Sequence, residues 1–150
     1  MGCGPAGIFA ALELSEERGL NVLMLDQGPD ISERRCPADP ETGCTRTCSP
    51  CPRSCGWGGG GAFSDGKLHI TSSIGGWLSE YRSEKELVRL SNHVDSIFLE
   101  FGAPQKLYGT DLLKVAEIQK KAALAGLKLV PSKLRHLGTD KCVTTLVKMR

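Results

Sequence analysis

Three closely spaced glycines near the N-terminus are the feature that most constrains the fold. Residues 2–7 read G-C-G-P-A-G, which is a G-x-G-x-x-G turn. In nucleotide-binding units these glycines allow a tight turn, close approach of backbone to a pyrophosphate, and close packing of helix on strand. The phosphates then lie at a helix N-terminus, where free N–H groups and the helix dipole favour negative charge. The motif alone is weak, so the residues that follow decide its interpretation.

The segment after the turn has the order expected of a nucleotide-binding unit. Apolar side chains at helical spacing follow Gly7, and Gly19 is placed to end that helix. Residues 20–25 (LNVLML) then predict a short buried strand, with Asp26 at its carboxyl end. An acid about 20 residues beyond the glycines is expected to accept hydrogen bonds from a ribose. The alternative is a glycine-rich turn before an ordinary amphipathic helix.

Most of the cysteines fall in one proline-rich loop. Of the seven in the chain, five lie between residues 36 and 55, namely Cys36, Cys44, Cys48, Cys51 and Cys55. The last four have the spacing C-x3-C-x2-C-x3-C, and thiolates at such spacing can converge on one soft metal centre, zinc or an iron–sulfur cluster. They are the candidate metal ligands, because a chain without an export signal favours metal or redox chemistry over disulfides. The alternative is a set of reduced cysteines without a metal.

A second glycine-rich segment follows the cysteines, and residues 55–68 read CGWGGGGAFSDGKL. Four successive glycines, Gly58–Gly61, carry no Cβ and let a planar ligand or a phosphate approach the backbone. The polar side chains immediately beyond them are Ser64, Asp65 and Lys67. A flexible linker, the alternative, would be richer in serine and would lack Trp57. The segment therefore predicts a ligand contact.

Residues 2–68 resemble the uncharacterised FAD-dependent dehydrogenases, flavoproteins with two dinucleotide-binding domains. The resemblance is carried by GCGPAGIFAALEL, LMLDQGPDISERRCP and CGWGGGGAFSDGKL, and more loosely by LRHLGTD near the end. It implies an α/β, Rossmann-like FAD-binding domain and flavin-mediated hydride or electron transfer with an unknown small-molecule substrate. NAD(P) is a further candidate, as the electron partner.

The resemblance also implies a set of cofactor contacts. The first glycines would hold the FAD pyrophosphate, the acid after the second strand its ribose, and the later glycines the flavin. The candidates are Gly2, Gly4, Pro5, Ala6, Gly7, Asp26, Gln27, Arg34, Gly59, Gly60, Gly61, Ser64, Asp65 and Lys67. Arg34 or Arg35 is expected near the phosphates, and Lys67 near the reduced flavin, whose negative charge a cation stabilises. No residue is assigned as catalytic.

Two departures from the family affect the expected function. Members begin with an apolar strand before the first glycine, where this chain has only Met1, and they continue for several hundred residues. We therefore expect a Rossmann-like domain without its first strand and its C-terminal part, which leaves residues 20–25 as an unpaired edge. Three functions stay open: a fragment of an FAD-dependent oxidoreductase, a cysteine-cluster module for electron transfer or structure, and a truncated product with neither activity.

The expected organisation has three parts. Residues 1–35 begin the FAD-binding domain, residues 36–56 form the cysteine-rich loop, and residues 57–150 combine the flavin-contacting segment with a mixed remainder. Ser83 opens a capping box, which predicts a helix to about Phe101. The other predicted elements are a strand and turn over 69–76, a helix over 111–125 capped by Thr110, a strand over 127–130 and a helix from Thr139.

Composition excludes some partners. The net charge is +2 with acids and bases interspersed, so we expect no nucleic-acid surface. No apolar run approaches the roughly 20 residues that cross a bilayer, and we expect a cytoplasmic protein without membrane contact.

Overall fold

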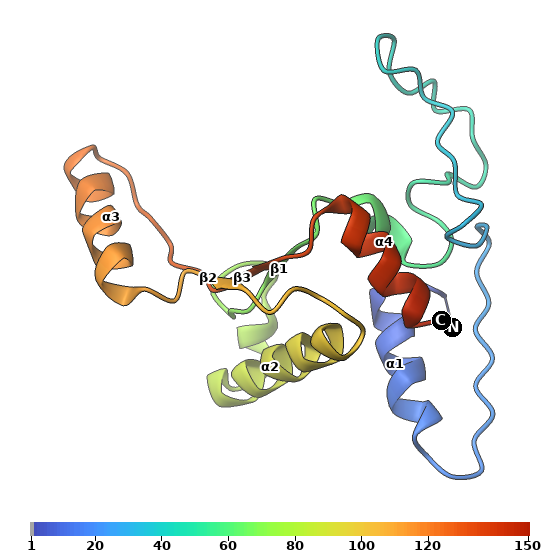
Figure 1. Cartoon of the computed structure of the whole chain (residues 1–150), viewed down its shortest axis with the longest axis horizontal. Coiled ribbons are helices and arrows are strands. Elements are labelled where there is room, and N and C mark those ends of the chain that lie inside the picture. The colour runs from blue at the N-terminus through green and yellow to red at the C-terminus, as the bar shows by residue number, and fades with distance from the viewer. Residues whose placement is uncertain (1) are drawn as a thin grey trace. The chain divides into compact units, whose positions relative to one another are not determined.

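The computed structural model describes residues 2–150 and places them in two compact units. The first unit comprises the chain up to Gly66 together with Gly138–Arg150, and the second comprises Lys67–Leu137. Figure 1 traces the chain and labels its elements. Along the chain, the boundaries between the two units fall after Gly66 and after Leu137. The three parts expected from the sequence have their boundaries after residues 35 and 56.

Helices are the main regular elements of both units. The first unit contains α1 (Pro5–Ser15), the 3-10 helix η1 (Gly59–Phe63) and α4 (Thr139–Lys148). The second contains β1 (Lys67–His69), the 3-10 helix η2 (Leu78–Glu80), α2 (Glu84–Glu100), β2 (Leu107–Tyr108), α3 (Leu112–Leu124) and β3 (Leu134–His136). None of the helices described over residues 2–150 is long and apolar enough to cross a membrane.

The sheet of the second unit is small and antiparallel. Its strand order is β1-β3-β2, and Arg135 of β3 stands opposite both Leu68 of β1 and Leu107 of β2. A mixed α/β class is therefore confirmed. The strands described over residues 2–150 form no parallel sheet, so the Rossmann-like arrangement stays a prediction.

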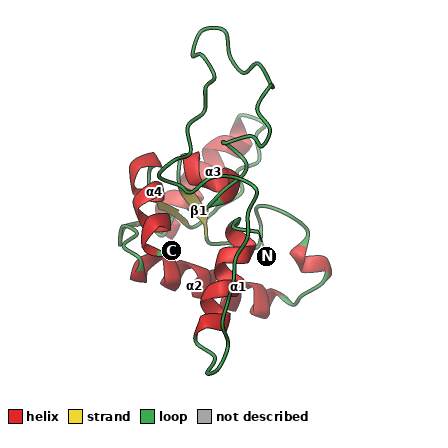
Figure 2. Cartoon of the chain, turned by 90° about the vertical axis from the view of Figure 1, so that its right-hand side faces the viewer, coloured by secondary structure: helices red, strands yellow, loops and turns green. Residues whose placement is uncertain are grey.

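The predicted strand over residues 20–25 is wrong. The segment has no strand or helix assignment, and the side chains of Leu23 and Leu25 are 74% and 67% exposed. A strand forms only when a neighbour accepts its backbone hydrogen bonds, and no other described segment pairs with these residues. Figure 2, coloured by secondary structure, draws everything between α1 and η1 as loop.

The core of the first unit lies where α1, η1 and α4 approach one another. Ile8 of α1 is 1% exposed, and Leu146 of α4 is buried. The indole Nε1–H of Trp57 donates to the carbonyl oxygen of Leu146 at 2.7 Å, which fixes α4 beside the glycine-rich segment. The helix predicted from Thr139 is confirmed, while α1 ends at Ser15, earlier than the predicted stop at Gly19.

Helix α2 forms as its capping signal predicts. The hydroxyl of Ser83 accepts a hydrogen bond from the Glu86 N–H at 3.3 Å, and the helix ends at Glu100. Leu87 and Ile97 are its buried residues, so its apolar stripe faces a core.

Three predictions in the second unit need correction. Asp111, not Thr110, caps α3, because its carboxylate accepts from the Lys114 N–H at 3.1 Å. The strand predicted over residues 127–130 does not form, and β3 begins later, at Leu134. The strand predicted to begin at His69 forms earlier in the chain: β1 covers Lys67–His69 and ends at that residue.

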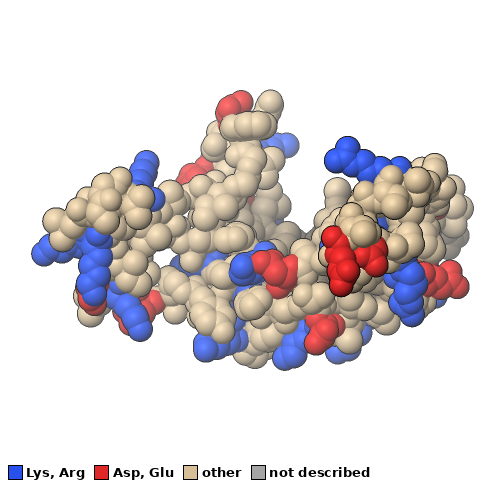
Figure 3. Space-filling view, turned by 90° about the horizontal axis from the view of Figure 1, so that it is seen from above, with Lys and Arg blue, Asp and Glu red and all other residues tan. Residues whose placement is uncertain are grey.

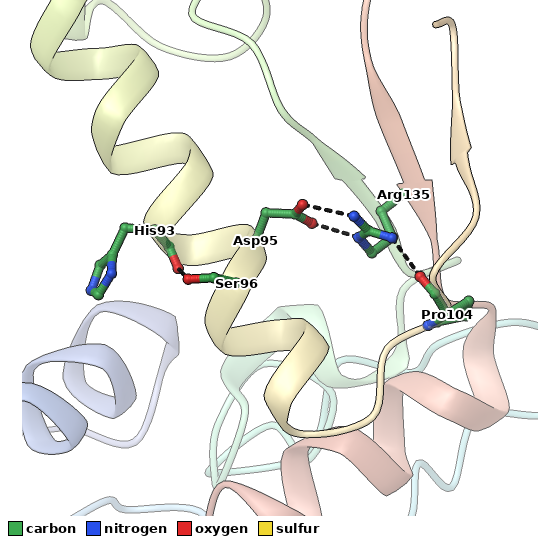
Figure 4. A network of polar contacts seen from close by, with 5 residues as sticks. All are labelled: His93, Asp95, Ser96, Pro104 and Arg135. Atoms are coloured by element: carbon green, nitrogen blue, oxygen red, sulfur yellow. Dashed lines mark hydrogen bonds and ion pairs between the residues drawn. The ribbon is translucent and has the colours of Figure 1, made fainter.

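A buried ion pair joins α2 to the sheet. The guanidinium of Arg135 donates through its Nε and one Nη to the carboxylate of Asp95, with 2.7 Å between the Nη and Oδ2 (Figure 4). Its other Nη donates to the carbonyl oxygen of Pro104. The hydrogen bond with Asp95 raises the pKa of Arg135, and two parallel charge-assisted bonds fix the angle between helix and strand.

Candidate functional site

The N-terminus of α1 presents backbone donors. Gly4 is its N-cap in an extended conformation, with no side chain capping the helix, and Pro5 occupies the first turn. The first intrahelical bond runs from the Ile8 N–H to the Gly4 carbonyl at 3.0 Å. Because proline has no N–H, the donors left at this helix start are the N–H groups of Ala6 and Gly7. Such a terminus favours an anionic group.

The glycines of the first turn have different surroundings. A Cβ on Gly7 would collide with the carbonyl oxygen of Gly2, so position 7 must be glycine for the turn to close. A Cβ on Gly2 would meet only Oδ2 of Asp26, at 3.6 Å. A Cβ on Gly4 would have no atom within 4 Å, so this face of the turn is open.

Asp26 connects three backbone segments through its carboxylate. Oδ2 accepts from the Cys3 N–H at 2.8 Å, and Oδ1 accepts from the N–H groups of Gly28 at 2.9 Å and Gly56 at 2.7 Å. The hydrogen bond from Gly28, and to a smaller extent that from Cys3, lowers the pKa of Asp26. A carboxylate has about four acceptor positions, so one on Oδ2 is left for a further donor. Asp26 as a whole is exposed to solvent.

The second glycine-rich segment lies directly on the first. The Gly58 N–H donates to the carbonyl oxygen of Cys3 at 2.8 Å. Gly59 has a φ of +56°, and a Cβ there would lie 3.2 Å from Cα of Gly4, so a larger residue meets both strain and crowding. Gly60 and Gly61 are open, with no atom within 4 Å of an added Cβ. The structure therefore brings together the two glycine segments and Asp26.

Arg34 lies inside the loop that leads to this site. Its side chain is 2% exposed, and its guanidinium donates to the carbonyl oxygens of Pro52 at 2.8 Å, Arg53 at 2.8 Å and Trp57 at 2.7 Å. Its Cζ also stacks 4.8 Å from the ring centre of Phe63. Burial lowers the pKa of Arg34. These contacts give Arg34 a positioning role, and its expected contact with a phosphate stays a prediction.

The other expected cofactor residues are distributed more widely. Gln27 donates through Nε2 to Sγ of Cys55 at 3.2 Å. The hydroxyl of Ser64 donates to the Gly61 carbonyl at 2.8 Å and accepts from the Gly66 N–H at 3.2 Å, which shapes the turn that also holds Asp65. Lys67 begins β1 and belongs to the second unit, where it stands opposite His136. Its expected role beside a flavin stays a prediction.

The four cysteines of the predicted metal set do not converge. All are free thiols, and no group of three or more His, Cys, Asp or Glu side chains within residues 2–150 is arranged to hold a metal ion. Sγ of Cys55 accepts a hydrogen bond from Nε2 of Gln27, while the Cys55 N–H donates to the carbonyl oxygen of Cys51 at 2.9 Å. The Ser54 hydroxyl has the largest effect on the pKa of the Cys51 thiol, which it lowers. The backbone N–H groups of Arg53 and Ser54 lower the same pKa to a smaller extent. Metal binding stays a prediction.

Sequence reasoning missed three contributors to the site. A Cβ on Gly28 would collide with the backbone of Cys55 and Gly56, so the glycine after Asp26 and Gln27 is a packing requirement. Trp57 anchors α4, and the thiol of Cys142 donates to the Gly61 carbonyl at 3.5 Å. The DQG triplet was a usable signal for Gly28, whereas nothing in the sequence indicates contacts that span more than eighty residues.

Comparison of the chain with protein-family models, with curated proteins and with solved structures found no match.

Proposed function

We propose that the first unit binds FAD and that the chain is part of an FAD-dependent oxidoreductase. The observation that carries the proposal is Asp26, whose carboxylate accepts N–H groups from both glycine-rich segments, at Cys3 and at Gly56. The resemblance of residues 2–68 to the FAD-dependent dehydrogenases agrees with it. One acid thus holds together the two stretches of backbone that a dinucleotide would contact.

The donors and acceptors fit the two halves of the ligand. The N–H groups of Ala6 and Gly7 suit the pyrophosphate, and the open face at Gly4 lets it approach the backbone. The remaining acceptor position on Oδ2 of Asp26 suits a ribose hydroxyl. Gly60 and Gly61 leave space against the backbone for the flavin ring.

The residues of this chain bind and orient, whereas bound FAD supplies the transfer of hydride or electrons. Arg34 holds the loop carbonyls of residues 52, 53 and 57, and so keeps the second glycine segment in place. The substrate is an unidentified small molecule, with NAD(P) as a candidate electron partner.

The test is a titration of the purified full chain with FAD, followed by quenching of flavin fluorescence and by equilibrium dialysis. FMN and riboflavin, which lack the adenosine ribose, serve as comparison ligands. We expect saturable binding of FAD and affinity at least about tenfold weaker for FMN, because a lost ribose contact costs about 1.4 kcal/mol or more. Equal affinity for FAD and FMN would remove the assigned role of Asp26.

Gly4→Ala is the variant that separates ligand contact from folding. Its φ of −76° is accessible to alanine and no atom lies within 4 Å of the new Cβ, so the fold tolerates it. The methyl group would instead occupy the space proposed for the pyrophosphate. We expect FAD affinity to fall at least about tenfold. The matched control is Glu117→Gln, a change in an exposed pair of the second unit, which should leave FAD affinity unchanged.

A further inference from the structure

A cavity in the first unit is lined by residues of the loop over 34–53, by the end of η1 and by the start of α4. Its volume is about 280 Å³. Its lining residues are Arg34, Cys36, Pro52, Arg53, Phe63 and Thr139, all of which belong to the first unit. A water molecule in the liquid occupies about 30 Å³, so the cavity has room for a small ion and several waters. We call it the arginine cavity.

The walls of the arginine cavity carry positive charge without a matching carboxylate. Arg34 and Arg53 both line it, and none of its lining residues is Asp or Glu. A neighbouring cavity of about 410 Å³ shares Arg53 with it, adds Arg46, and again has no acidic lining residue. Over the face seen in Figure 3, by contrast, basic and acidic side chains are interspersed. The two cavities therefore concentrate charge of one sign.

Arg34 is a buried cation whose hydrogen-bond acceptors are all neutral. It is 2% exposed, and three of its five N–H groups donate to backbone carbonyl oxygens of the loop. No carboxylate within residues 2–150 forms an ion pair with it. Burial lowers the pKa of Arg34, although the charge of Asp26 acts in the opposite direction. An anion in the cavity would supply the missing countercharge, and two N–H groups of the guanidinium are left to donate to it.

The start of α4 adds backbone donors. Gly138 is the N-cap, and no side chain caps the helix. The first intrahelical bond runs from the Cys142 N–H to the Gly138 carbonyl at 3.0 Å, so the N–H groups of residues 139–141 have no intrahelical partner. Thr139, the first residue of the helix, lines the cavity, whereas Asp140 of the same turn is exposed and does not. The positive end of the helix dipole therefore lies at the cavity.

We propose that the arginine cavity binds a phosphate group, held by the guanidinium groups of Arg34 and Arg53 and by the N-terminus of α4. Arginine donates charge-assisted hydrogen bonds to phosphate, and a helix start presents free N–H groups to it. A phosphate dianion matches the charge of the two guanidinium groups. The site is separate from the proposed FAD site, whose pyrophosphate would use N–H groups of α1. Inorganic phosphate and a phosphate monoester of a small molecule share this chemistry.

The test is a calorimetric titration of the full chain with inorganic phosphate in about 0.15 M NaCl, which screens charge effects beyond about 8 Å. We expect saturable binding of one phosphate per chain. Arg53→Met should weaken it at least about tenfold, because the exposed Arg53 side chain is not needed for an ion pair within residues 2–150 but lines the cavity. Arg35→Met is the matched control: it removes the same charge from an exposed residue outside the cavity wall and should keep the wild-type affinity.

Thr139→Pro tests the contribution of the helix start. Proline is favoured at the first position of a helix, and Gly138 before it has a ψ of 159°, the extended conformation that a residue before proline prefers. The substitution therefore keeps α4 but removes one N–H and one hydroxyl. We expect phosphate binding to weaken at least about twofold. Far-ultraviolet circular dichroism and urea unfolding without phosphate check that each variant retains the wild-type fold.

Two results would overturn the proposal: no saturable phosphate binding by the wild type, or equal losses for Arg53→Met and Arg35→Met. Glycerol 3-phosphate identifies the source of the group, because tighter binding than that of inorganic phosphate assigns a monoester and equal or weaker binding assigns the free ion. Both assignments support the site. Gly4→Ala should leave phosphate affinity unchanged, so failure of FAD binding and failure of this site are distinct results. Displacement of phosphate by FAD would contradict a separate site.

Discussion

The carboxylate of Asp26 accepts a hydrogen bond from the backbone N–H of Gly56 at 2.7 Å, although thirty residues separate the two in sequence. Through its other oxygen the same side chain holds the N–H of Cys3 in the first glycine-rich turn. Because both segments depend on one side chain, changes at Asp26 should affect the fold of the first unit as well as its ligand.

Asp26→Asn should destabilise the first unit. An asparagine offers a single carbonyl oxygen with two acceptor positions to the three N–H groups that Asp26 now satisfies, and its amide nitrogen would face a donor. We expect a loss of about 1–2 kcal/mol in the free energy of unfolding, measured with urea and tryptophan fluorescence. Asp39→Asn is the control, because Asp39 bonds only N–H groups two and three residues away and should cost less.

Acid should remove the contribution of Asp26. Its pKa is lowered in the folded chain, so its stabilisation is complete above the unfolded value, about 3.9, and is lost as the pH falls through the folded value. The urea midpoint of the wild type should therefore fall more steeply below about pH 4 than that of Asp26→Asn. Asp30 and Asp39, whose pKa values are also lowered, are present in both proteins and cancel in the difference. Parallel curves would contradict this assignment.

Gly7→Ala should destabilise the fold, whereas Gly4→Ala should leave its stability almost unchanged. The new methyl group at position 7 would collide with the carbonyl oxygen of Gly2, which is backbone and cannot move without opening the turn. At position 4 it meets nothing within 4 Å. We expect a loss of about 2 kcal/mol or more for Gly7→Ala and a change within about 0.5 kcal/mol for Gly4→Ala, by urea unfolding. Equal losses at the two positions would argue against the packing of this turn.

Arg34→Met should loosen the loop before the second glycine segment. The methionine fills a similar volume but leaves the carbonyl oxygens of Pro52, Arg53 and Trp57 without their donor in a buried setting. We expect a loss of about 3 kcal/mol and a changed Trp57 fluorescence spectrum. Arg35→Met, at the exposed neighbouring position, is the control and should be near neutral. A silent Arg34→Met would show that the three bonds do not hold the loop.

Asp95→Asn tests the second unit independently. It removes the charge partner of Arg135, whose side chain is only 4% exposed, and leaves a buried guanidinium with the Pro104 carbonyl but no countercharge. We expect a loss of about 3–5 kcal/mol by urea unfolding. Glu117→Gln breaks the exposed pair with Lys121 and should change stability by less than about 0.5 kcal/mol. Similar effects of the two substitutions would mean that the buried pair is not a structural link.

Local signals predicted the helices well. Ser83 begins α2 and Thr139 begins α4 as expected, because capping and apolar spacing act within a few residues. The error at the start of α3 was one residue, since Thr110 and Asp111 are both capping residues and the carboxylate is the one that bonds the Lys114 N–H. Such choices depend on small differences between adjacent side chains.

Strands and long-range contacts could not be predicted from such local signals. Residues 20–25 have a strand-like sequence, but a strand requires a partner, and no described segment supplies one. The sequence predicts Asp26 as a hydrogen-bond acceptor. Its bond to Gly56 depends on how the loop folds back, and so does the contact of Gln27 with Cys55. Cysteine spacing predicts Cys44, Cys48, Cys51 and Cys55 as one ligand set, whereas the arrangement of their side chains depends on the fold of the whole loop, and within residues 2–150 no such group is arranged to hold a metal ion.

The most direct test of the dinucleotide site is a ¹⁵N–¹H correlation spectrum of the full chain recorded during addition of FAD. We predict saturable shifts of the Ala6, Gly7, Gly60 and Gly61 amide signals, with the amides of Leu68 and Leu134 in the sheet unchanged. Absence of saturable shifts in the two glycine-rich segments, or shifts confined to residues 36–51, would contradict the assignment of this site to FAD.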